Sequence, residues 1–223
     1  MVTIHPISHA TAILKWGGEI IYTDPVGGAS AFEGQRKPTL ILITDIHWDH
    51  LSAETLAAIL PKDASLIAPK AVVDILPEAL AARAKIMVNG EKIEQNGFNI
   101  EAIPMYNIPE KVDSFHTKGR GNGYVVERDG FRVYIAGDTS DIPEMRALKD
   151  IDIGFVPMNL PYTMGVEEAA GAVLAFAPKK VYPYHYRGQD EFSDVHKFKE
   201  LVESHNPNIG VVLLNWYPEG VDK

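Results

Sequence analysis

Residues Thr39–His50 read TLILITDIHWDH, and this stretch decides the fold more than any other part of the sequence. Its first half, Thr39–Thr44, is a continuous apolar run, as expected of a strand buried on both faces. Its second half contains four potential metal ligands within six residues: Asp45, His47, Asp49 and His50. Loops at strand ends are where a rigid scaffold places functional residues. The stretch therefore predicts a buried strand that delivers a cluster of His and Asp side chains.

Strands and helices alternate on both sides of this stretch. Ser52 has the character of an N-cap, and it predicts a helix over Ala53–Leu60. Further strands are predicted at Val2–Ile7, Thr11–Trp16, Glu19–Tyr22, Ser65–Ala68, Lys85–Val88, Tyr124–Arg128, Phe131–Ala136, Asp152–Pro157, Lys180–Pro183 and Ile209–Asn215. Further helices are predicted at Ala71–Leu76, Glu78–Ala84, Pro143–Lys149, Val166–Phe176 and Asp194–Ser204. Two halves, each with strands first and helices after, indicate an α/β fold in which two sheets pack together with helices outside.

Composition limits the class of protein. The 223 residues suit a single domain over residues 1–223, with 46% hydrophobic and 23% charged residues as in ordinary globular proteins. The net charge of −9 without a basic run argues against a nucleic-acid partner. No apolar run reaches the ~18 residues of a membrane span, so we expect a soluble protein without a membrane partner. No signal peptide is visible, which predicts a cytoplasmic location, although one removed earlier would leave the same sequence.

The cluster at residues 45–50 has the side chains for metal binding. The sequence contains no cysteine, so any metal must be held by His and carboxylate groups, which suit zinc, manganese or iron. In an extended loop alternate side chains share a side, so Asp45, His47 and Asp49 are expected to converge, and His50 follows as the helix begins. The alternative is a solvated polar loop with chance histidines.

Three later residues strengthen the interpretation as a metal site. His116 lies in a glycine-rich loop, Asp138 closes a strand in Gly-Asp-Thr, and His185 closes another strand. Each alone is a weak signal, because a histidine at a strand end often makes only a hydrogen bond and an Asp before Thr can simply cap a turn. Together with the cluster at residues 45–50, and in this order, they predict one shared site.

The whole pattern resembles the metallo-β-lactamase superfamily, whose first motif reads H-x-H-x-D-H. The segments Ser8–Thr11 and Tyr22–Pro25 are similar to the branch that contains ascorbate-phosphate lactonases and N-acylphosphatidylethanolamine phospholipases. The resemblance covers nearly the whole chain and implies an αββα sandwich, with two mixed sheets packed face to face and the metals at one edge.

The resemblance also implies a role for each ligand candidate. His47 and His116 would bind a first metal, Asp49, His50 and His185 a second, and Asp138 would bridge the two. Asp45 stands where the family has its first histidine, and it would complete the first metal's ligands as a carboxylate. Zinc is the expected metal at both positions, and manganese or iron is an alternative at the position of Asp45.

This site predicts a dinuclear hydrolase. Two divalent ions would activate a bridging hydroxide that attacks a small ester, lactone or phosphodiester, and Asp49 would be the catalytic proton acceptor. The alternatives are a mononuclear iron dioxygenase of the same fold and a non-catalytic metal-binding protein. The partner is a small molecule, and a homo-oligomer is an open alternative. Four residues are candidates for support or substrate contacts, each with a structural role as the alternative: His9, Asp24, Lys118 and Arg187.

Overall fold

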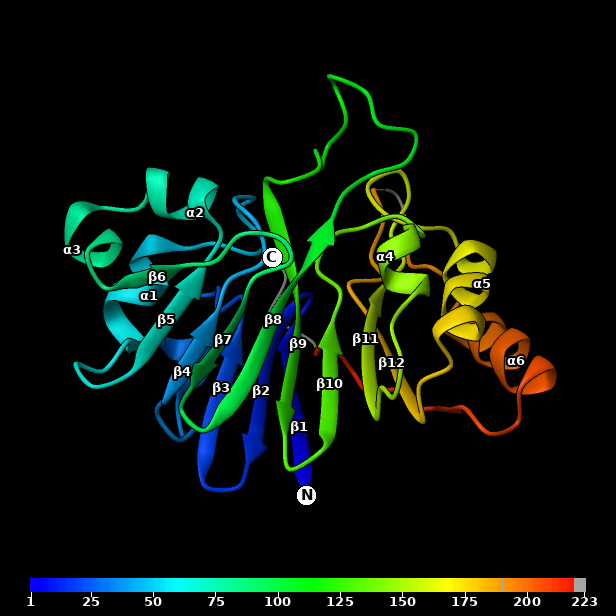
Figure 1. Cartoon of the computed structure of the whole chain (residues 1–223), viewed down its shortest axis with the longest axis horizontal. Coiled ribbons are helices and arrows are strands. Elements are labelled where there is room, and N and C mark those ends of the chain that lie inside the picture. The colour runs from blue at the N-terminus through cyan, green and yellow to red at the C-terminus, as the bar shows by residue number, and fades with distance from the viewer. Residues whose placement is uncertain (190, 219–223) are drawn as a thin grey trace. The chain divides into compact units, whose positions relative to one another are not determined.

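The computed structural model describes residues 1–189 and 191–218, which divide into two units. Unit 1 comprises Met1–Val88 with Asn215–Lys223, and unit 2 comprises Asn89–Leu214. Each unit contains one mixed sheet together with helices (Figure 1). The predicted α/β class with two mixed sheets is therefore confirmed, whereas the single domain over residues 1–223 stays a prediction.

The sheet of unit 1 has six strands in sequence order. An antiparallel meander of the first three strands continues into parallel pairings of the third with the fourth, the fourth with the fifth, and the fifth with the sixth. The elements are β1 (Val2–Ser8), β2 (Thr11–Trp16), β3 (Glu19–Thr23), the 3-10 helix η1 (Ala29–Phe32), β4 (Leu40–Leu42), α1 (Ala53–Ile59), β5 (Ser65–Ala68), α2 (Lys70–Ile75), α3 (Glu78–Ala81) and β6 (Ala84–Ile86).

The sheet of unit 2 has seven strands and repeats this plan. The first four strands pair antiparallel, and the remaining pairings are parallel. The elements are β7 (Lys92–Gln95), β8 (Phe98–Met105), β9 (Gly121–Arg128), β10 (Phe131–Ile135), α4 (Pro143–Arg146), β11 (Ile153–Pro157), α5 (Val166–Phe176), β12 (Lys180–Tyr184), α6 (Val195–His205) and β13 (Gly210–Val211).

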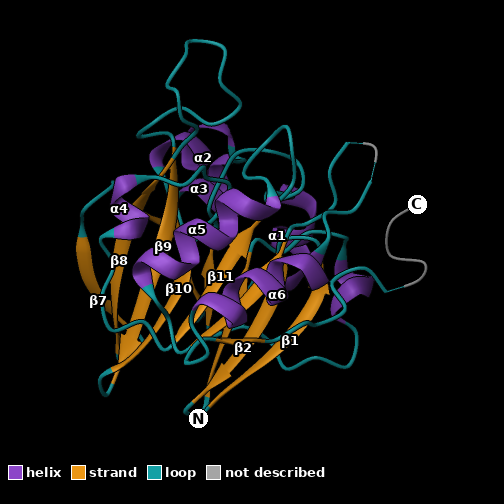
Figure 2. Cartoon of the chain, turned by 90° about the vertical axis from the view of Figure 1, so that its right-hand side faces the viewer, coloured by secondary structure: helices purple, strands orange, loops and turns teal. Residues whose placement is uncertain are grey.

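Each unit buries its own apolar core between sheet and helices. In unit 1 the core includes Ile41 of β4, Ile43 just after β4, and Leu56 of α1, and all three are fully buried. In unit 2, α5 and α6 lie against the sheet (Figure 2), and Phe176 of α5 meets Tyr134 of β10 edge to face at 5.8 Å. These two helices have 11 residues each, and the described residues contain no helix with the length and hydrophobicity of a membrane span.

Two parts of the structure differ from the sequence-based prediction. Residues 92–105 were assigned no strand, yet they form the hairpin of β7 and β8 around Asn96 and Gly97, whose φ angles are 53° and 72°. Asn-Gly favours this turn for the same reason as the correctly predicted Asp129-Gly130, because both residues tolerate positive φ. The predicted last strand is also too long, since β13 ends at Val211, where its pairing with β12 stops.

Candidate metal centre

Parallel strands of unit 1 bring the loop of residues 43–52, which we call the motif loop, next to Asp24. β3 and β4 are parallel neighbours, so their carboxyl ends lie at the same edge of the sheet. Asp24 follows β3, and the motif loop begins just after β4, where the backbone N–H of Thr44 donates to Oδ1 of Asp24 at 2.7 Å. The loop then turns into α1, whose N-cap is Ser52 as predicted, accepting from the Thr55 N–H at 3.1 Å.

His50 is held by this neighbouring strand end. Its Nδ1–H donates to Oδ2 of Asp24 at 2.9 Å, and the Thr44 hydroxyl donates to the same oxygen at 2.6 Å. All three side chains are fully buried. Burial raises the pKa of Asp24, and the attraction of His50 and the hydrogen bonds from His50 and Thr44 oppose this shift. With Nδ1 occupied, His50 is oriented as a ligand through Nε2, which is how a carboxylate partner prepares a metal-binding histidine.

The other motif residues form two close pairs within unit 1. Oδ2 of Asp45 lies 2.8 Å from Nδ1 of His47, and Asp45 is fully buried. Oδ2 of Asp49 lies 3.2 Å from Nε2 of His9. Metal–ligand bonds of ~2 Å place the donors to one ion about 3 Å apart, so the separation of Asp45 and His47 fits two donors to one cation.

His9 links Asp49 to the last described segment of the chain. Nδ1 of His9 lies 2.7 Å from the Tyr217 hydroxyl, and the His9 backbone N–H donates to the Trp216 carbonyl at 3.0 Å. The imidazole can therefore donate from Nε2 to Asp49 and accept at Nδ1 from Tyr217, which is a consistent neutral tautomer. Tyr217 was missed by the sequence analysis, because it has no local pattern that indicates a role.

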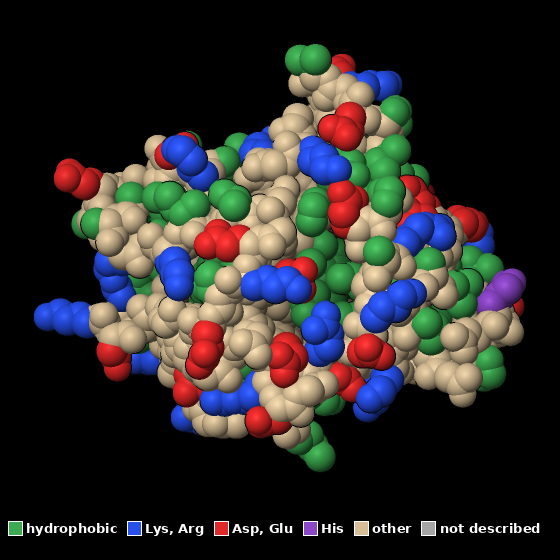
Figure 3. All heavy atoms as spheres, in the orientation of Figure 1, with side chains coloured by type: hydrophobic (Ala, Val, Ile, Leu, Met, Phe, Trp, Pro, Cys, Tyr) green, Lys and Arg blue, Asp and Glu red, His purple; other side chains and the backbone are tan. Residues whose placement is uncertain are grey.

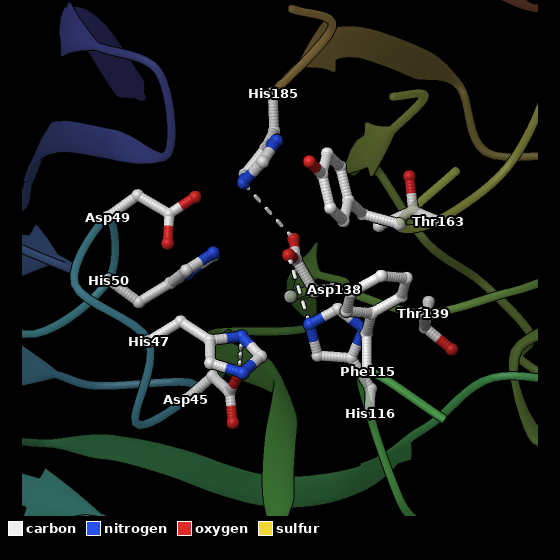
Figure 4. Close-up of polar contacts among 12 residues, drawn as sticks. Asp45, His47, Asp49, His50, Phe115, His116, Asp138, Thr139, Thr163 and His185 are labelled. Atoms are coloured by element: carbon white, nitrogen blue, oxygen red, sulfur yellow. Dashed lines mark ion pairs between the residues drawn. The ribbon is translucent and has the colours of Figure 1, made fainter. Parts of the chain in front are cut away.

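Parallel strands also gather the ligand candidates of unit 2. Asp138 follows β10 and His185 follows β12, and both strands pair in parallel with β11, so the two residues lie at the same sheet edge. Oδ1 of Asp138 lies 3.4 Å from Nε2 of His185, and Oδ2 lies 3.3 Å from Nε2 of His116 (Figure 4). All three side chains are buried. Asp138 thus contacts both histidines through different oxygens, as a bridging carboxylate would.

Asn107 fixes the tautomer of His116. Its Oδ1 lies 2.8 Å from the His116 backbone N–H and 3.2 Å from Nδ1, and its Nδ2 donates to the Tyr162 carbonyl at 2.9 Å. These backbone contacts orient the amide so that its oxygen accepts from Nδ1 of His116, and the neutral ring with this tautomer has its lone pair at Nε2. Two acceptors, Nε2 and the Asp138 oxygen, then face one another at 3.3 Å. Two acceptors at this distance repel each other unless a proton or a cation lies between the two atoms.

The predicted ligands thus come together in two sets, one in each unit. Asp45, His47, Asp49 and His50 lie in the motif loop of unit 1, and His116, Asp138 and His185 lie at the sheet edge of unit 2. Their convergence on one shared site stays a prediction. Asn107 and Thr44 were not among the predicted residues, although both are polar residues just beyond a strand end, which is the signal that could have found them.

The two predicted cationic contacts lie in unit 2. Nζ of Lys118 is 2.7 Å from Oε1 of Glu144 and lies over the Tyr106 ring at 4.6 Å from its centre. The hydrogen bond to Glu144 raises the pKa of Lys118. Arg187 follows His185 and forms an isolated β-bridge with Phe192. Lys118 therefore has an ion-pair partner within the protein, and a substrate role for either residue stays a prediction.

A sequence profile and the sequences of individual relatives match this chain and agree with each other. A sequence profile described as "Beta-lactamase superfamily domain" matches residues 3–185. A metal-dependent hydrolase of Thermococcus onnurineus is 31% identical over 91% of this chain and 92% of its own length.

Solved structures agree with the sequence matches. A crystal structure from Parabacteroides distasonis, of a protein described as a metal-dependent hydrolase, has a TM-score of 0.84 at 36% identity and covers 97% of this chain and 94% of that one. CmlA, a diiron β-hydroxylase from Streptomyces venezuelae, shares the fold at a TM-score of 0.70 and 17% identity, over 96% of this chain and 52% of its own. At that identity the likeness extends to the fold alone.

Proposed function

Because the chain belongs to the β-lactamase superfamily, we propose that it is a dinuclear metal-dependent hydrolase of a small ester, lactone or phosphodiester. The contact between His116 and Asp138 carries this proposal. A lone pair on Nε2 faces a carboxylate oxygen at 3.3 Å in a buried position, and a divalent cation would satisfy both atoms. The relatives that are described as metal-dependent hydrolases support the same reading.

The proposed ligands are divided between two cations. His47, His116 and Asp45 would hold the first, and Asp49, His50 and His185 would hold the second. Asp138 would bind both, because its two oxygens contact different histidines. The donor set of imidazoles and carboxylates fits zinc, manganese or iron.

The protein's own residues then prepare the reaction. A pair of divalent cations lowers the pKa of water toward neutrality and stabilises negative charge on a carbonyl or phosphoryl oxygen. His9 donates to Oδ2 of Asp49 and so orients this carboxylate, whose Oδ1 would take the proton of the attacking water. Asp24 and Asn107 keep His50 and His116 in the tautomer that ligation through Nε2 requires.

The experiment that tests this function combines metal content with turnover. We expect two equivalents of divalent metal per chain and hydrolysis of generic aryl esters or bis-aryl phosphodiesters. Chelation should abolish the hydrolysis, and zinc or manganese should restore it, because the nucleophile depends on the metal. A single iron per chain with oxygen uptake in the presence of a reductant would support the dioxygenase alternative. Metal binding without turnover of any substrate would support the non-catalytic one.

A second prediction concerns Asp45, where the sequence departs from the superfamily motif. With Asp45 as a ligand, the site has three carboxylates instead of two, so the sum of metal and carboxylate charges falls from +2 to +1. Carboxylate is also a harder ligand than imidazole, which favours manganese or iron over zinc. We expect Asp45→His to shift the zinc-over-manganese preference by about tenfold toward zinc.

Metal analysis after loading with equimolar zinc and manganese checks this shift. Asp45→Asn is the matched control, because it removes the charge and keeps the shape. If Asp45→His changes neither occupancy nor preference, Asp45 is not a ligand and the first metal has only His47, His116 and the bridging Asp138.

A further inference from the structure

We propose that the substrate is a neutral ester whose acyl or aryl group is apolar, and that three loops of unit 2 hold this group. This inference rests on the proposed hydrolase function. The loops carry five exposed hydrophobic residues, which we name the apolar rim: Ile108, Val112, Phe115, Leu160 and Phe192. In the reaction, the acyl carbon–oxygen bond breaks, the oxygen of water bonds to the acyl carbon, and the leaving alkoxide takes the proton that this water gave to Asp49.

The apolar rim is confined to three loops of unit 2. Half of the ten large hydrophobic side chains that are exposed among the described residues lie in the loops 106–120 and 158–165 and in residues 185–189 and 191–194. Leu160 is 57% exposed and Val112 is entirely exposed. The first loop stands out from the strands of unit 2 in Figure 1, and hydrophobic side chains are visible at its tip in Figure 3. Scattered single residues need no explanation, but five on three loops that approach one another favour a binding surface.

The same loops carry two of the proposed ligands. Phe115 directly precedes His116, and the third loop begins at His185. Figure 4 draws Phe115 with His116 and Asp138. An apolar group held by the rim would therefore lie next to the bond that the metal centre cleaves.

Contacts within unit 2 tie the rim together and to His116. The rings of Phe115 and Tyr162 pack edge to face, with their centres 4.9 Å apart. Asn107, which orients His116, donates to the Tyr162 carbonyl at 2.9 Å. Gly188 runs so close to Leu160 that a Cβ there would lie 2.8 Å from the Leu160 carbonyl oxygen. The rim is thus built on the same contacts that orient a ligand.

The charges beside the rim favour a neutral substrate over an anionic one. Lys118, the cation nearest to His116 in sequence, is paired with Glu144 at 2.7 Å and covers the Tyr106 ring. Arg120, the next cation along the chain, donates to the Phe115 carbonyl. Two of the three cations of the first loop thus have partners within unit 2, whereas Lys111 lines a hollow together with His116. Phosphodiester recognition normally uses Arg or Lys groups directed at the phosphate oxygens. An apolar ester needs no such partner.

The test compares esters that differ only in chain length. On metal-loaded full-length protein, we expect kcat/KM for 4-nitrophenyl octanoate to exceed that for the acetate by at least about tenfold, since each fully buried methylene is worth roughly fourfold in binding. Phe115→Ser and Leu160→Ser should flatten this gradient. Ile75→Ser on α2, at a position 58% exposed and in the other unit, is the matched control and should keep it.

A binding measurement separates the rim from catalysis. The methyl ester of dansyl-labelled undecanoic acid, an uncharged probe, should bind the metal-free protein, and the two rim variants should weaken this binding at least about fivefold while Ile75→Ser does not. Equal kcat/KM for acetate and octanoate, with no binding of the uncharged dansyl ester, would overturn the inference and leave the hydrolase intact. Rim variants that only convert a dimer to a monomer in sedimentation, with an unchanged gradient, would assign the rim to a second copy. If no ester or phosphodiester is cleaved, the proposed function itself fails.

Discussion

Asp138→Ala is expected to lower kcat/KM for ester hydrolysis by more than about a hundredfold, because residues that merely orient a ligand already cost 10–100-fold in affinity or activity. Asp138 contacts His116 through one oxygen and His185 through the other, so its loss would remove the bridge between two cations. The nucleophile would be lost with it. The fold should survive, because Asp138 follows β10 and lies outside the strand pairings that build the sheet.

Steady-state kinetics on metal-replete protein, with a count of bound metal, measures this effect. Asp141→Asn is the control variant, since Asp141 lies three residues further on and pairs with Arg146 at 2.6 Å instead of a histidine. We expect Asp141→Asn to retain activity. Turnover of metal-replete Asp138→Ala at the wild-type rate would refute the dinuclear mechanism, and His50→Ala should give a loss as large as that of Asp138→Ala.

The second large effect is expected at Asp24. This fully buried carboxylate accepts three hydrogen bonds, from the Thr44 N–H, the Thr44 hydroxyl and Nδ1 of His50. Asp24→Ala leaves the N–H and the hydroxyl of Thr44 without this acceptor, while Nδ1 of His50 can still donate to the Thr44 oxygen at 3.0 Å. Each buried donor that loses its acceptor costs about 1–3 kcal/mol. The metal-free protein should therefore lose about 2 kcal/mol or more, or roughly 4–8 °C in melting temperature for a chain of this size.

Asp24→Asn separates stability from metal binding. The amide oxygen can still accept from the Thr44 N–H, but the amide nitrogen would face Nδ1–H of His50. The ring would have to move its proton to Nε2, which removes the lone pair that the metal needs. We expect a smaller loss of stability than for alanine and a 10–100-fold loss of metal affinity, measured by titration calorimetry. Unchanged metal affinity in Asp24→Asn would show that Asp24 has only a structural role.

Local patterns in the sequence predicted much of the fold and the ligand candidates. The motif loop, the Ser52 cap and the hairpin at Asp129-Gly130 depend on neighbours a few residues apart, so the sequence alone reveals them. The partners of these residues depend on contacts between distant segments. The ion pair of Lys118 with Glu144, which is 26 residues away, exists only in the folded chain and could not be predicted from its sequence neighbours.

Not every miss has this cause. The hairpin at Asn96-Gly97 had a local signal as clear as that at Asp129-Gly130, and it was overlooked. By contrast, the role of Asn107 appears only when the turn that brings it to His116 and the loop that brings it to Tyr162 are both in place. A residue of this kind can be named as polar and close to a strand end, but its partners follow from the folded chain.

The bond between His9 and Tyr217 has a consequence for how the protein is made. These residues are 208 positions apart, yet they belong to the same unit, which is therefore assembled from both ends of the described chain. At ribosomal rates of ~5–20 residues per second, His9 emerges roughly 10–40 s before its partner is synthesised. During that interval the nascent chain can pair β1 with β2, but the His9 imidazole does not yet have its hydrogen bond to the Tyr217 hydroxyl. Synthesis of the segment that carries Tyr217, and not the completion of the first sheet, is then the event that finishes unit 1.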